Sequence, residues 1–380
     1  MNAQFDATIE SDTQTATELT VAFDSRHLTE RGTDVALYDY ADLNEQVLGN
    51  RSLICCPATA RIDCLDRFRE RFEVLLYHSI AGLERGLDGV DVYYRQVAGR
   101  RDATWPLPQR AGLRTAVHAV FEADDAHGDV YAAISDFVAA RHAATAKRPP
   151  VVPYVVRPMP AADVDVRAIL GIPPTAIVFG RHGGLETFDL DFAREAVREA
   201  VRARDDLWFL FVNTLPFDAH PRVLFLDKIV EPAFKRSFIE ACDAMLHARA
   251  MGESFGLACA EFSICNKPVV TWFASRDRYH IDVLRERGIY YCDKGDLLRI
   301  LLSFAPRAGD YDAYSQRFDP LTIMRIFDSV FLEPARRAKQ NELRYLDGAL
   351  ASPLGAALTA SVNVQGVPDG GSASVLAYQF

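Results

Sequence analysis

MLHARAMGESFGLACAEFS (residues 245–263) joins an apolar run to a helical pattern through a short turn that contains glycine. The run AMLHA (244–248) has the length of a buried strand, and GLACAEFSIC (256–265) has the apolar spacing of a helix. Two glutamates, Glu253 and Glu261, stand eight positions apart, a spacing that places two helical residues near one face. A strand, a glycine turn and a helix in this order are typical of a doubly wound α/β fold.

The same alternation continues on both sides of this stretch, because short apolar runs are separated by amphipathic helical patterns. In the first half we expect strands at 19–25, 52–56, 74–79, 90–97, 114–121 and 130–135, and helices at 33–48, 61–72 and 137–147. In the second half we expect strands at 176–180, 207–213, 222–226, 244–248, 267–272 and 288–292, and helices at 188–204, 231–242, 256–265, 278–287 and 296–304.

A proline-rich segment, residues 147–165, separates the two halves, and its prolines favour extended chain. We therefore predict two Rossmann-like doubly wound parallel-sheet domains that face a central cleft. The expected order is a disordered N-terminus (1–17), an N-terminal Rossmann-like domain (18–155), a C-terminal Rossmann-like domain (156–319), a helix (320–346) and a flexible tail (347–380).

Composition narrows the class of protein. The net charge of -10 disfavours nucleic acid as a partner. The sequence contains no run of 18 apolar residues, so we expect no transmembrane segment. The polar N-terminus lacks the pattern of a secretory signal. The seven scattered cysteines form no CxxC pair and are typical of reduced thiols. We expect a cytoplasmic protein, with transient association at the inner face of a membrane as an alternative.

The turn after residue 252 has the chemistry of an anion site. The first amides of a helix lack partners within it and carry the positive end of its dipole, so Phe255, Gly256 and Leu257 are expected to seat a phosphate, with Ser254 beside them. A carboxylate accepts two hydrogen bonds and suits a sugar diol. The spacing alone leaves open that both glutamates are merely solvated.

A second glycine-rich turn, Gly180-Arg181-His182-Gly183-Gly184, follows the strand at 176–180. Glycine allows close approach of the backbone to a phosphate, and an arginine presents a fork of donors. The spacing matches neither the dinucleotide fingerprint GxGxxG nor a P-loop. A glycine turn with a solvated arginine is the alternative interpretation.

Together these stretches resemble the retaining family-4-like glycosyltransferases of the GT-B class. That family carries a Glu-x7-Glu motif at the start of a C-domain helix, which stands here as Glu253-Ser-Phe-Gly-Leu-Ala-Cys-Ala-Glu261. The following Asn-Lys-Pro-Val-Val (266–270) is similar to the family's next strand. The resemblance covers the order of the C-terminal domain and is looser across the N-terminal domain.

The resemblance implies roles for single residues. Glu253 would hold the hydroxyls of the donor sugar, Glu261 the ribose hydroxyls, and Arg181 would neutralise the diphosphate leaving group. The family's lysine a few residues beyond that arginine is missing, and Arg249 or, less well, Lys228 would replace it. The nucleobase of the donor would lie near the ends of neighbouring strands, at Asn213, Thr214 and Leu226.

In the N-terminal domain, the resemblance places His118 opposite the donor and Gly32 in a loop over the phosphates. A lone histidine in an apolar run is otherwise a core residue, and that alternative stays open. The triplets Asp163-Val-Asp165 and Asp189-Leu-Asp191 lie in a linker and at a helix start, so we expect no metal site and no cofactor beyond the nucleotide sugar.

The expected activity is therefore the transfer of a sugar from a nucleotide-diphosphate sugar to an acceptor, with retention of anomeric configuration. The acceptor would be a glycan, a lipid-linked molecule or a small molecule, and a homodimer is compatible with the sequence. A nucleotide-sugar epimerase and a non-catalytic nucleotide-sugar-binding subunit are the alternatives on the same fold. A phosphorylase lacks an assignable pyridoxal lysine, and an NAD-dependent oxidoreductase lacks its fingerprint.

Overall fold

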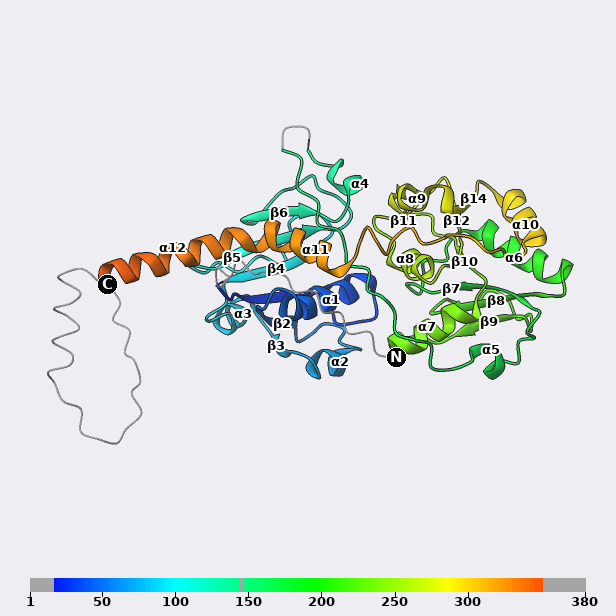
Figure 1. Cartoon of the computed structure of the whole chain (residues 1–380), viewed down its shortest axis with the longest axis horizontal. Coiled ribbons are helices and arrows are strands. Elements are labelled where there is room, and N and C mark those ends of the chain that lie inside the picture. The colour runs from blue at the N-terminus through cyan, green and yellow to red at the C-terminus, as the bar shows by residue number, and fades with distance from the viewer. Residues whose placement is uncertain (1–16, 144–146, 351–380) are drawn as a thin grey trace, which may run out of the picture. The chain divides into compact units, whose positions relative to one another are not determined.

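The computed structural model describes residues 17–143 and 147–350 (Figure 1). Two compact units divide the chain, and one of them, Glu18–Glu333, contains both sheets. The predicted disordered N-terminus (1–17) lies outside the described residues except for Thr17, and so does the predicted flexible tail (347–380) except for residues 347–350, which continue a helix instead. The domain boundaries at 155 and 319 stay a prediction.

The first half of the chain forms a parallel six-stranded sheet in the order β3-β2-β1-β4-β5-β6. Its strands are β1 (Thr20–Asp24), β2 (Arg51–Pro57), β3 (Glu73–Tyr77), β4 (Val92–Val97), β5 (Arg114–Ala119) and β6 (Val130–Ala133). Its helices are α1 (Gly32–Gln46), α2 (Leu65–Arg69), α3 (Ile80–Gly86) and α4 (Asp136–Ala139). The central strand β1 is almost wholly buried, which explains its apolar sequence.

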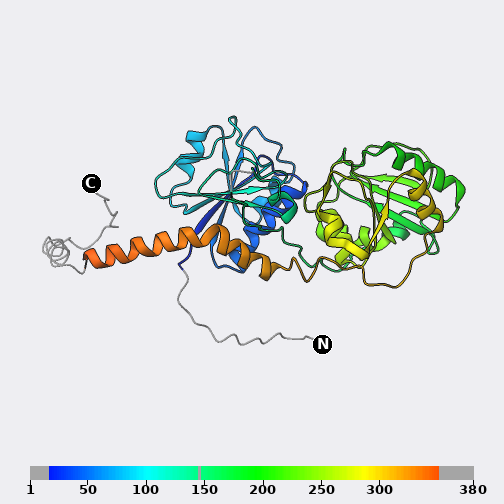
Figure 2. The same cartoon turned by 90° about the horizontal axis from the view of Figure 1, so that it is seen from above.

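The second half of the chain forms another sheet (Figure 2), which is parallel and six-stranded in the order β14-β12-β10-β7-β8-β9. Its strands are β7 (Ile177–Arg181), β8 (Leu207–Val212), β9 (Val223–Leu226), β10 (Ala244–His247), β12 (Val269–Trp272) and β14 (Gly288–Tyr291). The accompanying helices are α5 (Val166–Ile169), α6 (Asp191–Ala203), α7 (Pro232–Ala241), α8 (Leu257–Ile264), α9 (Tyr279–Leu284), the 3-10 turn Arg285–Arg287 and α10 (Lys294–Ser303).

Both sheets have the strand order of a dinucleotide-binding Rossmann fold, and the predicted pair of doubly wound sheets is confirmed. In each parallel sheet the order in which strands are added reverses beside the first strand, between β1 and β4 and between β7 and β10. Ligands of such sheets bind outside the carboxyl ends of the strands at this reversal. The loops after β1, β7 and β10 therefore decide where a site can form.

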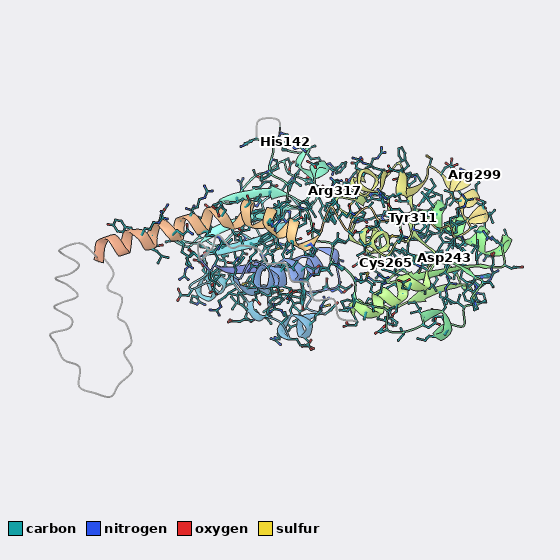
Figure 3. All side chains as sticks on the ribbon, viewed as in Figure 1. His142, Asp243, Cys265, Arg299, Tyr311 and Arg317 are labelled. Atoms are coloured by element: carbon teal, nitrogen blue, oxygen red, sulfur yellow. The ribbon has the colours of Figure 1, made fainter. Side chains whose placement is uncertain are left out.

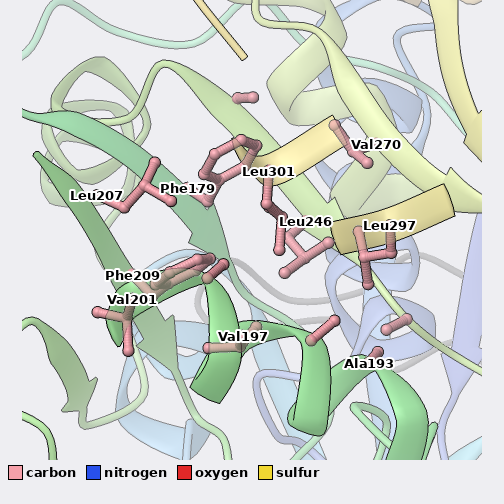
Figure 4. Packing of buried hydrophobic residues seen from close by; sticks show 14 of the residues in the cluster. Phe179, Ala193, Val197, Val201, Leu207, Phe209, Leu246, Val270, Leu297 and Leu301 are labelled. Atoms are coloured by element: carbon pink, nitrogen blue, oxygen red, sulfur yellow. The ribbon is translucent and has the colours of Figure 1, made fainter. Parts of the chain in front are cut away.

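Apolar packing fixes the second sheet. Phe179 of β7, Leu246 of β10 and Val270 of β12 belong to one buried cluster with Val197 of α6 and Leu297 of α10 (Figure 4). Helix α6 is strongly amphipathic, and its apolar face packs into this cluster while its charged residues lie on the other face. The packing holds the carboxyl ends of β7 and β10 side by side.

Hydrogen bonds to side chains complete the frame of the second sheet. Asp243, labelled in Figure 3, accepts hydrogen bonds from the Val178 amide (2.8 Å) and from Arg167 Nη2 (2.9 Å). Asp293 caps α10 by accepting a hydrogen bond from the Asp296 amide. The Asp243 contacts tie β7, α5 and the start of β10 together at the amino-terminal edge of the sheet, which is remote from the site, whereas the Asp293 cap follows the carboxyl end of β14.

Several segments differ from the sequence-based prediction. The short helices α3 and α5 were not expected. Of the helix expected at 137–147, the described residues form only α4, and Arg141 beyond it pairs with Asp277 at 2.7 Å. The helix expected at 61–72 shortens to α2. A two-stranded sheet, β11 (Gly252–Glu253) and β13 (Asp277–Arg278), is an addition that the periodicity missed because each strand has only two residues.

The predicted helix at 320–346 is present as three consecutive helical segments. They are α11 (Pro320–Phe327), a π-helical turn (Asp328–Leu332) and α12 (Glu333–Leu350). Asp319 caps α11 through the Thr322 amide, with Pro320 at the first helical position. Residues from Pro334 onward belong to the other compact unit.

Candidate functional site

Two adjoining pockets lie at the carboxyl ends of the strands within the unit Glu18–Glu333. The larger pocket has a volume of about 480 Å³ and is lined by the loops after β1, β7 and β10, by the end of β4 and by the first residues of α8. The smaller pocket has a volume of about 100 Å³ and lies between the start of α1, the loop after β7, the segment 228–235 and α8. Gly32, His182 and Leu257 line both pockets, so the two form one continuous candidate site.

Glu253 lines the larger pocket from β11. Its Oε1 lies 3.2 Å from His247 Nε2, and its Oε2 accepts a hydrogen bond from Arg249 Nη1 at 3.0 Å. Burial alone would raise the pKa of this carboxyl, but the His247 hydrogen bond and the Arg249 charge lower it to about 2. Glu253 is therefore an ionised acceptor at neutral pH, on a strand rather than at the helix start.

The turn between Glu253 and α8 depends on Gly256, which caps the helix with φ of 90°. A Cβ atom there would lie 3.1 Å from the Cβ of His280, so glycine serves both the backbone conformation and the close packing. The first helical hydrogen bond runs from the Ala260 amide to the Gly256 carbonyl. The free amides of the helix are thus those of residues 257–259, which moves the expected anion seat toward Leu257.

Ser254 and Phe255 also line the larger pocket, ahead of the helix. Phe255 is almost fully buried, and its ring packs against Tyr154 and Phe318 at centroid separations of 5.4 and 4.9 Å. The aromatic contacts fix the chain just before the free amides. The sequence pattern contained no signal for Tyr154, which reaches the pocket from the proline-rich segment.

Glu261 lies on α8 and lines the smaller pocket, whereas Glu253 lines the larger one. Its Oε1 accepts a hydrogen bond from Lys235 Nζ at 2.8 Å, and its Oε2 lies 2.9 Å from His182 Nε2. Burial opposes ionisation, but the Lys235 charge and the His182 contact lower the pKa of Glu261 to about 2. Lys235 of α7 is a cation that sequence reasoning missed, since no motif connects it to the glutamates.

Arg181 lines the larger pocket, and its terminal nitrogens are already engaged by protein groups. Nη1 donates to the carbonyl of Asn213 (3.0 Å) and to the Thr214 hydroxyl, and Nη2 donates to the carbonyl of Gly184 (2.8 Å) and to the Thr187 hydroxyl (2.5 Å). Burial lowers the pKa of this guanidinium to about 10, so it stays charged at neutral pH. The structure therefore corrects the expectation of a freely pointing fork: Arg181 supplies charge and holds two loops together.

The two candidates for a second cation occupy different places. Arg249 lines the larger pocket and pairs with Glu253. Lys228 lines the smaller pocket and lies 3.4 Å from Glu30 Oε2 and 3.2 Å from Asp63 Oδ2. Lys228 thus links the loop after β9 to two loops of the first sheet.

The expected base-binding residues are only partly brought together. Asn213 lines the smaller pocket in a left-handed conformation with φ of 47°, and its Nδ2 donates to the Gly183 carbonyl at 2.8 Å. Thr214 is buried and bonded to Arg181, and Leu226 contributes its carbonyl to the Asn213 amide at 3.0 Å. Neither Thr214 nor Leu226 lines the described pockets, so both support Asn213 from behind.

The first sheet contributes the loop after β1 and the start of α1. Gly32 begins α1 and lines both pockets, and its contact with a phosphate stays a prediction. Buried Asp34 orders this loop by accepting hydrogen bonds from the Ser25 hydroxyl (2.9 Å) and from the amide of Thr29 (2.9 Å). His27 lines the larger pocket beside Asp34, with Nδ1 at 3.6 Å from Oδ2. The opposite face of the site is therefore a rigid loop.

Trp105 is a further pocket residue that the sequence analysis missed. The guanidinium of Arg95 lies 3.8 Å from its ring centroid and that of Arg26 lies 5.0 Å away. The Arg95 charge is buried and paired with Asp24 at 2.9 Å. An isolated tryptophan between turn residues carries no periodic signal, so only the structure assigns it to the site.

His118 does not reach the site, which corrects the prediction that it faces a ligand. It is fully buried in β5, its Nδ1 lies 2.7 Å from the Tyr94 hydroxyl, and its ring packs near Tyr40 and Phe331. Burial lowers its pKa to about 3, so it is neutral at ordinary pH. The core interpretation, which the sequence left open, is the one that its burial supports.

Gly180, which was expected to bind substrate, lines neither of the two pockets. It lies within β7, and a Cβ atom there would lie 2.2 Å from Cys242 Sγ. Its missing side chain therefore makes room for the packing of α7 against the sheet, whereas His182 and the glycines that follow line the pockets.

Within residues 17–143 and 147–350, no group of three or more His, Cys, Asp or Glu side chains is placed to hold a metal ion. In the same ranges, no helix has both the length and the apolar character needed to cross a membrane.

Comparison with known proteins identifies the fold. No protein-family model matches the chain, and no curated protein matches its sequence. Anabaena HepE in complex with UDP-glucose is similar in structure, with a TM-score of 0.63 and 15% identity over 82% of this chain and 99% of that one. A Rickettsia africae glycosyltransferase gives a TM-score of 0.55 and 11% identity over 86% and 97% of the two chains.

A Listeria monocytogenes protein described as a UDP-N-acetylglucosamine 2-epimerase is also similar, with a TM-score of 0.52 and 12% identity over 83% and 96% of the two chains. At such low identity, these likenesses show the fold. They confirm the GT-B architecture of two Rossmann-like domains that the sequence predicted.

Proposed function

We propose that this protein is a glycosyltransferase that moves a sugar from a nucleotide-diphosphate sugar to an acceptor. The observation that carries the proposal is the arrangement around α8. Two ionised glutamates, Glu253 and Glu261, flank the free amides that begin at Leu257, and Gly32 lines both pockets from the other sheet. This spacing offers a diol site, an anion seat and a second diol site in succession.

In this proposal the donor lies along α8. Its diphosphate contacts the amides at the helix start, its ribose hydroxyls donate to Glu261, and its sugar hydroxyls donate to Glu253. The base lies near Asn213 in the smaller pocket. Similarity to HepE, which was solved with UDP-glucose bound, supports a nucleotide sugar as the ligand class.

Negative charge develops on the departing diphosphate when the bond to the anomeric carbon breaks. Arg249 is half-buried at the pocket, Arg181 contributes a buried charge, and the helix amides contribute oriented dipoles. We propose that these groups stabilise the leaving group without a metal ion and without a cofactor. Preorganised charge in a partly dry pocket is worth more than the same charge in water.

We further propose a family-4-like reaction with retention of configuration. The acceptor oxygen forms the new bond on the face that the diphosphate leaves, and the acceptor proton passes to the departing phosphate oxygen. The acceptor is a glycan, a lipid-linked molecule or a small molecule, and it enters beside the loop after β1 and Trp105. The Glu-x7-Glu resemblance is the support for this stereochemistry.

The alternative function is that of a nucleotide-sugar epimerase, which the similarity to the Listeria protein favours. Both enzymes need the same donor site, and they differ in whether an acceptor receives the sugar. The test is incubation with UDP-, GDP- and dTDP-sugars, with product analysis by chromatography. Release of nucleoside diphosphate that increases with an added acceptor supports transfer, whereas conversion of the donor to its epimer supports the alternative.

A further inference from the structure

A chain of buried polar side chains runs from α9 to Glu253 beneath the larger pocket. His280 Nε2 lies 3.0 Å from Thr271 Oγ1, and Thr271 Oγ1 lies 2.8 Å from His247 Nδ1. His247 Nε2 then lies 3.2 Å from Glu253 Oε1. The three supporting residues come from α9, β12 and β10, so secondary structure rather than a loop holds the chain in place.

Burial makes each link of this chain consequential. His280 and Thr271 are fully buried, and His247 is 6% exposed. A buried imidazole nitrogen without a partner is costly, and a hydroxyl is a small group that donates one hydrogen bond while accepting another. Thr271 is therefore suited to bridge two imidazoles, and valine, which has nearly its shape, would satisfy neither.

The chain also touches the turn that carries the anion seat. The Cβ of an alanine at position 256 would meet His280 Cβ at 3.1 Å and Glu253 Cβ at 3.3 Å, so the backbone of Gly256 rests directly on both residues. The orientation of the Glu253 carboxylate is thus fixed from below by His247 and from the side by Arg249.

We propose that Thr271 and His280 are positioning residues that, through His247, hold the Glu253 carboxylate in the orientation that selects the donor sugar. The proposal rests on the proposed function, because it assigns Glu253 to the sugar. It separates sugar recognition from nucleotide recognition: the Thr271 chain supports Glu253, whereas Glu261 is held independently by Lys235 and His182. Loss of the chain should therefore affect the sugar and spare the nucleoside diphosphate.

The experiment compares Thr271→Val with Thr271→Ser in the full-length protein. Calorimetry measures affinity for UDP, GDP and dTDP and for their glucose derivatives, and the same proteins are assayed for turnover. We expect Thr271→Val to bind the preferred nucleoside diphosphate within twofold of wild type and to lose about tenfold in kcat/KM for the nucleotide sugar. Thr271→Ser keeps the hydroxyl and should retain most of the activity.

The outcomes distinguish this inference from the proposed function. Equal losses for nucleoside diphosphate and nucleotide sugar, no loss in Thr271→Val, or the same loss in Thr271→Ser would each overturn the positioning role while leaving the donor site intact. If wild type binds no nucleotide in the panel, the proposed function is contradicted, and so is this inference, which depends on it. His280→Met removes the far end of the chain and provides the same comparison if Thr271→Val does not fold.

Discussion

Lys235 Nζ donates a hydrogen bond to Glu261 Oε1 at 2.8 Å, so a cation from α7 neutralises the second glutamate of the site from the side. With 16% of its side chain exposed, Lys235 is well shielded from solvent. The pair keeps Glu261 ionised and in place without using the helix amides. Lys235 is thus a further cation of the site, besides Arg249 and Lys228, which the sequence offered.

Replacing Lys235 with methionine should weaken nucleoside diphosphate binding about tenfold, because the ionised Glu261, which we assign to the ribose hydroxyls, would lose its buried charge partner. Calorimetry with the preferred nucleoside diphosphate measures the effect. Lys267→Met is the matched control, since Lys267 contacts Glu240 before β12 and lines neither described pocket. Equal affinities of the two variants would contradict a role for Lys235 in the site.

Gly256→Ala should lower both stability and ligand affinity. The φ of 90° and the 3.1 Å approach to His280 together predict a loss of about 1–2 kcal/mol in the free energy of unfolding. Gly171→Ala is the control, because Gly171 has φ of 65° but no atom within 4 Å of the added Cβ. Urea unfolding should show a loss in both variants, and binding should fall only in Gly256→Ala.

His118 predicts a specific pH dependence of stability. Its pKa in the folded protein is lowered to about 3, so the unfolded chain takes up a proton below the ordinary pKa of about 6.5 whereas the folded protein does not. Stability is therefore full above pH 6.5 and falls as the pH drops from 6.5 toward 3, by about 2 kcal/mol at pH 5 from this group. The loss should be smaller in His118→Phe.

Urea unfolding at pH 7 and pH 5 measures this difference, and the same variant tests the placement of His118 in the core. His118→Phe should bind the nucleoside diphosphate within twofold of wild type, since His118 lines no described pocket. A tenfold loss of affinity in a folded variant would return His118 to the site.

The alternation of apolar runs and helical patterns was enough to predict both sheets, since each buried parallel strand leaves its own apolar segment in the sequence. The eight-residue spacing of the glutamates did not by itself decide their role, since Glu253 lies on a strand and only Glu261 on the helix; the resemblance singled out both residues, and each lines one of the pockets. The two-residue strand β11 was too short to leave a pattern, so the helix start was placed too early. Lys235 and Trp105 were missed because their place in the site depends on tertiary packing.

Arg181 and His118 show the other limit of sequence reasoning. Both are polar residues in or beside buried strands, and the sequence does not tell whether such a side chain faces a cleft or the interior. Arg181 reaches the pocket, but its terminal nitrogens donate hydrogen bonds to the Asn213 and Gly184 carbonyls and to neighbouring hydroxyls. The side chain of His118 packs among aromatic residues in the core.

The most direct test of the central claim compares wild type with Glu253→Gln for release of nucleoside diphosphate from the panel of nucleotide sugars. Glutamine keeps the size of the side chain but removes the charge that pairs with Arg249. We predict release by wild type, a loss of at least about 100-fold in Glu253→Gln, and nearly unchanged binding of the nucleoside diphosphate itself. Equal release by both proteins, or no binding of any nucleoside diphosphate by wild type, would contradict the account.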